Sequence, residues 1–302
     1  MPVANFGGNN SWGYNPNAHL ALDKSYGPPQ GFKQFVEAAH QRGIAVIMDV
    51  VYNHITTQSP LSQLYGSNLD NPFLEPQPGE DLSADRGFCD DFFAELNHGS
   101  PFIKNYIDRA NEYWLEEFNV DGFRFDLAKC VADDGVTISQ PGYEAAVTEG
   151  WKAAADHVWD TVDPNTLMIL EFSGDPSVEN ELGGYRSDNT GGMTTWYNMN
   201  SIYSQADMGY LSGDGGTSDF SSSYFGNRSG YDQASYVSYM ESHDEQWLMR
   251  RKKAFGNSTE GYSTRILKTA LNRQKLVGGF FFTVPGPKMM WQFGELGYGW
   301  GE

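Results

Sequence analysis

Short apolar runs, each followed by charged or imidazole side chains, recur along the chain. The runs cover residues 44–48, 120–125, 167–170 and 236–240. Apolar runs of this length, bounded by turn-forming residues, are typical of buried parallel strands. The polar groups that end them are, in chain order, Asp49 to His54, Asp126, Glu171 and Glu241 to Asp244. Since parallel strands deliver such groups to one mouth of an α/β barrel, the pattern predicts an active site there.

Helical spacing of apolar residues occupies the intervals between these runs. It predicts helices over 28–42, 100–118, 143–159 and 264–276. Gly43 ends the first, and Ser100 with Pro101 forms the start of the second. A weaker strand is expected at 193–199 and a final one at 287–293. This alternation of strand and helix predicts a parallel α/β fold with right-handed crossovers.

Three stretches lack a sustained period. Residues 5–16 are rich in Gly and Asn and are expected to form a loop, and residues 204–231 are rich in Ser and Gly and are expected to form a surface connection. Residues 55–97 are long for a barrel loop, so they are expected to be a functional insertion or a small subdomain. The predicted organisation is a partial barrel over 1–54, an insertion over 55–97 and the remainder of the barrel over 98–302.

The acidic composition narrows the possible partners. With 302 residues the chain can bury a large core, but its formal net charge is −19 and its pI is about 4.6. Nucleic acid requires a basic face, so it is not expected as a partner, and an anionic membrane surface is disfavoured for the same reason. Aromatic residues make up 15% of the chain, and many of them lie in Gly/Asn-rich stretches where they can pack or stack on sugar rings.

Other sequence signals say little about location. The two cysteines, Cys89 and Cys130, provide neither a disulfide framework nor zinc-site spacing. No apolar run is long enough for a membrane span, so no membrane insertion is expected. The polar, turn-like residues after Met1 do not resemble a signal peptide. The compartment therefore stays open.

Together, the four polar segments resemble, in order, spacing and position at strand ends, the motifs of the α-amylase superfamily of glycoside hydrolases (family 13). A single motif such as Asp-x-x-x-Asn-His is weak, whereas all four in sequence are specific, and the resemblance covers essentially the whole chain. It implies a (β/α)8 TIM-type barrel with a loop-rich insertion after strand three. Met1 to Val3 would be the end of the second strand, so the first strand and most of the second would be missing.

The resemblance assigns roles to three carboxylates. It implies that Asp126 is the nucleophile, Glu171 the general acid/base and Asp244 the group that stabilises the oxocarbenium-like transition state. Retaining glycosidases need such a pair of carboxyl groups about 5 Å apart. Arg124 lies two residues before Asp126, on the same strand face. It is expected to keep Asp126 ionised while Glu171 stays protonated.

The family also implies a set of substrate-binding residues. His54 and His243 resemble a pair that hydrogen-bonds the reacting sugar, Tyr14 resembles an aromatic platform, and Lys129 matches a position on the leaving-group side. Arg124 completes this set. By contrast, Asp49, Glu241 and Glu245 are interpreted as structural or supporting groups. Four further histidines have no evident partners and are interpreted as surface or core residues: His19, His40, His98 and His157.

No cofactor is expected to be required, although Ca²⁺ is possible. Asn53 could ligate calcium, as its counterpart does in many relatives. The position that is often a calcium-ligating histidine in those relatives is Cys130 here. A thiol is a poor ligand for this hard cation, and no metal site is assigned.

The predicted function is hydrolysis of α-1,4-glucosidic bonds in starch- or glycogen-type glucans. One alternative is a 1,4-α-glucan branching enzyme, since residues 12–16 and 242–245 are shared with branching-type relatives. Phe172 argues against it, because branching enzymes commonly have an acidic or small polar residue after the acid/base. The other alternative is an inactive glucan-binding fragment, because an unclosed sheet exposes its edges. Chain-length preference and linkage selectivity are not readable from the sequence.

Overall fold

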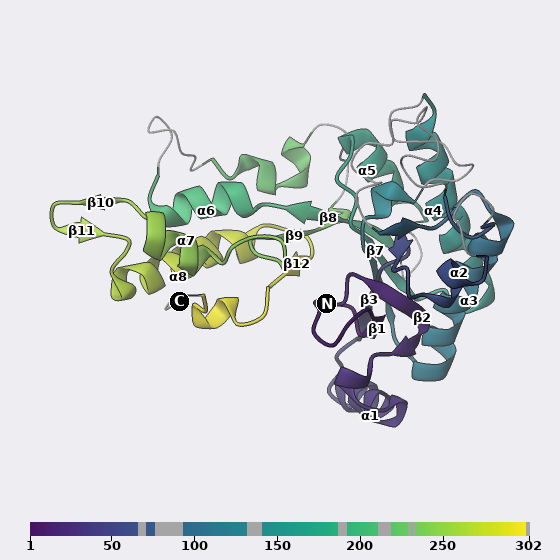
Figure 1. Cartoon of the computed structure of the whole chain (residues 1–302). Coiled ribbons are helices and arrows are strands. Elements are labelled where there is room, and N and C mark those ends of the chain that lie inside the picture. Colours follow the sequence, from purple (N-terminus) through teal and green to yellow (C-terminus); the bar gives the residue numbers. More distant parts are fainter. Residues whose placement is uncertain are drawn as a thin grey trace. The chain divides into compact units, whose positions relative to one another are not determined.

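The computed structural model describes residues 1–65, 71–75, 93–131, 141–186, 192–210, 219–228, 231 and 234–299 (Figure 1). The chain divides into two compact units. The first comprises Met1–Gly174 and Glu181–Thr194, and the second comprises Asp175–Asn180 and Thr195–Glu302. Each unit contains parallel strands joined by helices, as the sequence predicts.

Three parallel strands form the centre of the first unit, in the order β3 (Ile47–Val50), β6 (Gly122–Phe125) and β7 (Leu167–Leu170). Their register is continuous, so that Gly122 pairs with both Ile47 and Leu167. All four residues of β6 are buried, which is why its sequence is an uninterrupted apolar run apart from Arg124. These strands confirm the predicted ones, although β3 begins three residues later than the apolar run at 44–48.

The close approach of β6 and β7 depends on a residue without a side chain. A Cβ atom at Gly122 would lie 2.2 Å from the carbonyl oxygen of Leu167, which belongs to the neighbouring backbone. No side chain fits in that space. Glycine at this position therefore fixes the spacing of the two strands that end in Asp126 and Glu171.

Helices of the first unit bury the apolar stripes that the sequence predicts. α1 (Pro29–His40), α3 (Pro101–Phe118) and α4 (Tyr143–Thr161) confirm the predicted helices. α5 (Pro176–Gly184) follows β7 and is divided between the units, with its residues up to Asn180 in the second. On α3, Ile103, Ile107, Ala110, Trp114 and Phe118 are all buried, as expected from their spacing. Ser100 occupies the N-cap position of α3, but its side chain makes no capping hydrogen bond.

The structure corrects the prediction made for the Gly/Asn-rich start of the chain. Met1 to Val3 is not in a strand, and the two ends of the expected loop over 5–16 belong to the strands of an antiparallel hairpin. Its strands are β1 (Ala4–Phe6) and β2 (Pro16–Leu22), with irregular register between them. The apolar side chains that pack this hairpin, such as Ala4 and Phe6, are too few to stand out in so polar a stretch.

The described part of the predicted insertion contains little regular structure. β4 (His54–Ile55) pairs with β5 (Ala94–Glu95), and α2 (Pro60–Gln63) is a single turn. Residues 66–70 and 76–92 of the predicted insertion lie outside the described residues. The domain boundaries at 54/55 and 97/98 therefore stay predictions.

Three parallel strands also form the sheet of the second unit, in the order β12 (Lys288–Met289), β9 (Tyr236–Tyr239) and β8 (Met193–Asn198, with Thr195 onwards in this unit). Figure 1 shows helices α6 (Asn200–Met208), α7 (Leu248–Phe255) and α8 (Leu267–Thr283) grouped beside them. A short hairpin joins β10 (Ser258–Thr259) to β11 (Tyr262–Ser263). Their buried core includes Met199, Tyr203, Leu248, Val277 and Phe281.

Several expectations for this unit were wrong in extent. Residues 204–231 were expected to form an irregular connection, but Asn200 to Met208 form the helix α6. Within that range, residues 211–218 and 229–230 lie outside the described residues. The final strand is two residues long instead of the predicted 287–293. Helices α5 and α7 were not predicted at all. Four of the eight residues of α7 are lysine or arginine, so its apolar stripe is short.

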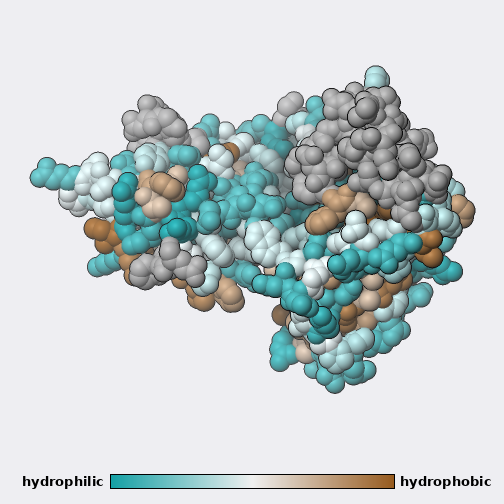
Figure 2. All heavy atoms as spheres, viewed as in Figure 1, coloured by the Kyte–Doolittle hydropathy of each residue, from teal (hydrophilic) through white to brown (hydrophobic). Residues whose placement is uncertain are grey.

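The surface is mostly hydrophilic, with separate apolar patches that Figure 2 shows in brown. Exposed apolar residues include Phe280 and Phe282 on α8. None of the helices in the described part of the chain is sufficiently long and apolar to cross a lipid bilayer.

The two cysteines were expected to provide no disulfide framework, but Cys130 is disulfide-bonded.

Candidate active site

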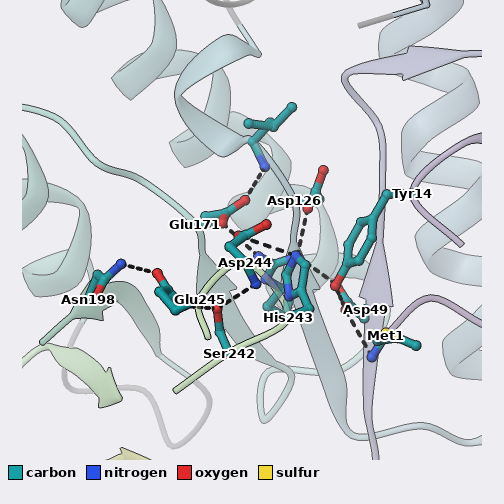
Figure 3. A network of polar contacts seen from close by, with 12 residues as sticks. Met1, Tyr14, Asp49, Asp126, Glu171, Asn198, Ser242, His243, Asp244 and Glu245 are labelled. Carbon is teal, nitrogen blue, oxygen red and sulfur yellow. Dashed lines mark hydrogen bonds and ion pairs between the residues drawn. The ribbon is translucent and has the colours of Figure 1, made fainter. Parts of the chain in front are cut away.

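Arg124 is the centre of the polar cluster in the first unit. It lies on β6, is 5% exposed, and contacts carboxylates from all three parallel strands or the turns that follow them. Its Nη1 donates hydrogen bonds to Asp49 Oδ1 at 2.9 Å and to Asp126 Oδ1 at 2.8 Å (Figure 3). Its Nη2 forms an ion pair with Glu171 Oε1 at 2.9 Å. Continuous register of β3, β6 and β7 places these groups together.

The contacts with Arg124 limit the separation of the two predicted catalytic carboxyl groups. The terminal nitrogens of a guanidinium are about 2.3 Å apart, so the contacting oxygens of Asp126 and Glu171 can be at most about 8 Å apart. An oxygen–oxygen separation of at most about 8 Å excludes distances too long for a glycosidase pair. It is compatible with the separation of about 5 Å between the two carboxyl groups of a retaining enzyme.

The turn after Asp126 also holds Glu171. Leu127 has a left-handed conformation with φ 47° and ψ 39°, which costs roughly 1–2 kcal/mol for a residue with a Cβ. In this conformation the Leu127 N–H donates to Glu171 Oε2 at 2.8 Å, and the Ala128 N–H donates to the Glu171 carbonyl at 3.0 Å. The strained turn therefore fixes one carboxyl group directly beside the other.

The charge balance of the cluster differs from the expectation. Burial raises the pKa of Asp126 to about 8, and the charges of Glu171 and Asp49 add to this effect, while Arg124 opposes it. Asp126 was expected to stay ionised through Arg124, but a single guanidinium is shared among three carboxyl groups. Burial also opposes ionisation of Asp49, yet Arg124 and the Tyr14 hydroxyl hold the pKa of Asp49 below its usual value. The Asp126–Glu171 pair therefore retains a proton near neutral pH.

The raised pKa of Asp126 predicts a pH dependence of stability. In the unfolded chain this carboxyl group has a pKa of about 3.9. Between that value and about 8, the folded state binds a proton that the unfolded state releases. The contribution of Asp126 to stability is therefore complete below about pH 4 and is lost as the pH rises through 8. We expect Asp126→Asn to be more stable than the parent at pH 8, with a smaller gain at pH 4, as measured by thermal unfolding. An equal gain at both pH values would contradict the assignment.

Tyr14 and His54 lie beside this cluster. The Tyr14 hydroxyl donates to Asp49 Oδ2 at 2.8 Å, and its ring centroid is 5.8 Å from the Arg124 guanidinium carbon (Figure 3). Burial raises the pKa of Tyr14, so the hydroxyl stays protonated. His54 Nε2 donates to the Tyr14 carbonyl at 2.8 Å, and burial lowers the pKa of His54, which favours the neutral ring. Asp49 was interpreted as structural, and its bonds to Arg124 and Tyr14 agree with that interpretation.

The remaining predicted residues are placed as follows. Lys129 belongs to the short 3-10 helix Ala128–Cys130 that follows β6. His243 and Asp244 belong to the second unit, in the turn after β9. There the His243 Nε2 lies 3.4 Å from Asp244 Oδ2, and the side chain of Asp244 is 56% exposed. The roles of these residues in catalysis or substrate binding stay predictions.

The four histidines without predicted partners do have them. His19 contacts the Tyr106 hydroxyl at 3.1 Å, His40 pairs with Asp121 at 2.9 Å, His98 bonds the Tyr52 carbonyl at 2.8 Å, and His157 pairs with Glu112 at 2.9 Å. These contacts join segments that are far apart in the sequence. They agree with the interpretation of the four as surface or core residues, although the spacing of residues in the sequence did not indicate the partners.

The structure allows a partial test of the calcium possibility. The side-chain oxygen of Asn53 is buried and accepts no hydrogen bond, which suits a hard cation. Cys130 is disulfide-bonded and cannot supply a thiolate. Among the described residues, no three His, Cys, Asp or Glu side chains lie together in a way that could hold a metal ion. One oxygen donor is a weak basis for a metal centre.

Parallel strands that bring carboxyl groups together at their carboxyl ends define an α/β-barrel enzyme site. The comparisons with known proteins agree with this class. Residues 5–73 match the family model described as the alpha amylase catalytic domain. The structure superimposes over 100% of its length on an Anoxybacillus α-amylase, covering 60% of that chain with a TM-score of 0.70 and 19% identity. A Paenibacillus barengoltzii pullulanase is matched over 48% of its chain with a TM-score of 0.71 and 19% identity. These likenesses confirm the fold as an incomplete (β/α)8 barrel.

Sequence relatives point to the same family. The chain is 35% identical over 134 residues to the malto-oligosyltrehalose trehalohydrolase of Saccharolobus solfataricus, which is 44% of this chain and 22% of the relative. It is 29% identical over 219 residues to the 1,4-alpha-glucan branching enzyme of Nitratidesulfovibrio vulgaris, which is 71% of this chain and 33% of the relative. These matches show that the chain is similar to enzymes of the α-amylase superfamily of glycoside hydrolases, family 13. It spans about a fifth to a third of the length of these curated relatives.

Proposed function

We propose that the chain carries the catalytic centre of a retaining glycosidase that cleaves α-1,4-glucosidic bonds in starch- or glycogen-type glucans. The observation that carries this proposal is the pair of carboxyl groups, Asp126 and Glu171, held by one buried guanidinium. The upper limit of about 8 Å on their separation is compatible with the spacing of about 5 Å that a double-displacement glycosidase requires. Similarity to a 1,4-alpha-glucan branching enzyme supports an α-glucan as the substrate partner.

The chemistry follows from the contacts of these two residues. In the first step Asp126 attacks the anomeric carbon while Glu171 gives its proton to the departing glycosidic oxygen. In the second step Glu171 takes a proton from water, whose oxygen attacks the same carbon and releases Asp126. The raised pKa of Asp126 agrees with a pair that keeps one proton. The proposed reaction requires this proton to lie on Glu171, so that Asp126 is ionised when it attacks.

Other predicted residues complete the proposed site. Asp244 stabilises positive charge on the sugar, and Tyr14 supplies a ring for the sugar face. His54 and His243 bond sugar hydroxyls, Arg124 orients the carboxyl pair, and Lys129 contacts the leaving-group side. We propose that no cofactor is required and that Ca²⁺, if it binds near Asn53, has a structural role. Product analysis after incubation with amylose tests the function, and shorter oligosaccharides with new reducing ends are expected.

A branching transferase is the second candidate. The match to a branching enzyme covers 71% of this chain, more than the trehalohydrolase match does. The same covalent intermediate would then react with a sugar hydroxyl in place of water. New α-1,6 linkages without an increase in reducing ends would favour this candidate over hydrolysis. Binding of amylose with neither product would indicate a glucan-binding fragment.

Substituting Glu171 tests its role as acid/base. We expect Glu171→Gln to lower turnover of amylose by about 10²–10⁴-fold, because the glycosidic oxygen leaves without a proton. An aryl glycoside with a good leaving group should lose much less of its first-step rate, measured as the release of the aryl group in a burst. Near-full activity of the variant on starch would show that another residue is the acid.

A further inference from the structure

The turn that carries His243 and Asp244 connects β9 to α7 within the second unit. Asp244 is more than half exposed, so packing of its own side chain does not fix it. Its backbone N–H donates to Ser242 Oγ at 3.1 Å, and Ser242 and Asn198 both donate to the carboxyl group of Glu245 (Figure 3). The position of Asp244 therefore depends on how the ends of this turn are held.

Glu241 connects the two ends of the turn. It lies at the first end, two residues after the last residue of β9, and is 5% exposed. Its Oε1 accepts a hydrogen bond at 2.5 Å from the backbone N–H of Leu248, the first residue of α7. Trp247, the N-cap residue of α7, makes no side-chain capping bond. Glu241 thus takes the place of a helix cap, and a carboxylate at a helix N-terminus is electrostatically favourable.

A glycine makes room for this carboxyl group. A Cβ atom at Gly294 would lie 2.6 Å from Glu241 Oε2. Glu241 also faces a cavity of about 270 Å³ whose lining includes Gln274, Trp291 and Glu295. The carboxyl group therefore accepts the Leu248 N–H through Oε1, while Oε2 lies in space that a side chain at position 294 would occupy.

We propose that Glu241 is a positioning residue that clamps the turn 241–248 and so sets the place of His243 and Asp244. The expected effect of Glu241 on catalysis rests on the proposed function, because Asp244 contacts substrate only if that function is correct. The clamp itself is a property of the second unit. Glu241 acts through the backbone of the turn and touches no reacting atom.

The clamp predicts a difference between two substitutions of one residue. Glu241→Ala removes the acceptor of the Leu248 N–H, whereas Glu241→Gln keeps an oxygen in nearly the same place. Burial raises the pKa of Glu241 to about 7, and above that pH the carboxylate is charged. A hydrogen bond to a charged group corresponds to about 10–100-fold in an equilibrium. We expect the Leu248 amide to exchange its hydrogen about 10–100-fold faster in Glu241→Ala, with faster exchange at 243–247, and near-parent protection in Glu241→Gln.

Two further variants separate the clamp from general loss of stability. Gly294→Ala keeps the carboxyl group but displaces it, and should also accelerate exchange at Leu248. Glu295→Ala removes an exposed acid from the same cavity and should leave exchange unchanged. Hydrogen exchange measured by NMR under native conditions, with thermal unfolding of each variant, gives these comparisons without any need for turnover.

Activity then tests the catalytic consequence. With amylose as substrate, we expect kcat of Glu241→Ala to fall by about 10–100-fold with KM changed less than about threefold, and Glu241→Gln to restore most of kcat. Unchanged exchange at Leu248 in Glu241→Ala, or equal loss of kcat in the Gln and Ala variants, would overturn the proposal. Loss of turnover in the parent chain would refute the proposed function, while the exchange data would still decide whether Glu241 clamps the turn.

Discussion

Asp126→Ala is expected to lower turnover of an α-1,4-glucan by on the order of 10⁴-fold or more. The carboxyl group at this position is the proposed nucleophile, and no neighbouring group can take its place. Asp49 is bonded to Arg124 and Tyr14, and Glu171 is held by Arg124 and the Leu127 N–H. Glucan affinity should change little, because Asp126 acts mainly in forming the covalent bond. Steady-state kinetics and equilibrium binding of maltohexaose give the two quantities.

The matched control for this substitution is Glu116→Ala. Glu116 is an exposed acid on α3, so its substitution removes a carboxyl group without altering the site. We expect its turnover to equal that of the parent chain. Retention of more than about a hundredth of parent turnover in Asp126→Ala would show that Asp126 is not the nucleophile.

The strands that carry the site were predictable because their residues are buried on both faces. The runs ending at Asp126 and Glu171 are continuous and apolar, and the structure places β6 and β7 there. By contrast, β1 and α7 were missed. The hairpin containing β1 lies in a Gly/Asn-rich stretch, and α7 is rich in basic residues, so neither has the apolar pattern on which the predictions depend.

Contacts within the site were less predictable than its members. The sequence placed Arg124 beside Asp126 but gave no sign that it also contacts Asp49 and Glu171. The pKa of Asp126 was therefore expected in the wrong direction. Likewise, the left-handed turn at Leu127 has no glycine to mark it. These features depend on strand register and burial, which a local pattern does not contain.

Lys252→Met is expected to destabilise the second unit more than the other substitutions considered. Lys252 on α7 and Asp207 on α6 are both fully buried. The Lys252 amine donates to both carboxylate oxygens of Asp207, at 2.7 and 2.6 Å, and to Gln274 Oε1 on α8 at 3.0 Å. Burial lowers the pKa of Lys252 and raises that of Asp207 to about 6, so each charge depends on the other. Removing one partner leaves an uncompensated buried charge, which costs about 3–5 kcal/mol.

The double variant Asp207→Leu with Lys252→Met distinguishes this explanation from a simple loss of packing. Without either charge, the three helices can meet through apolar contacts, and replacing a buried pair in this way is often close to neutral. We therefore expect the double variant to recover most of the stability that Lys252→Met loses, as measured by urea unfolding of all four chains in the cycle. If the double variant were as unstable as the sum of the two single variants, the pair would have no coupling, and the cost would lie in the lost side-chain volume.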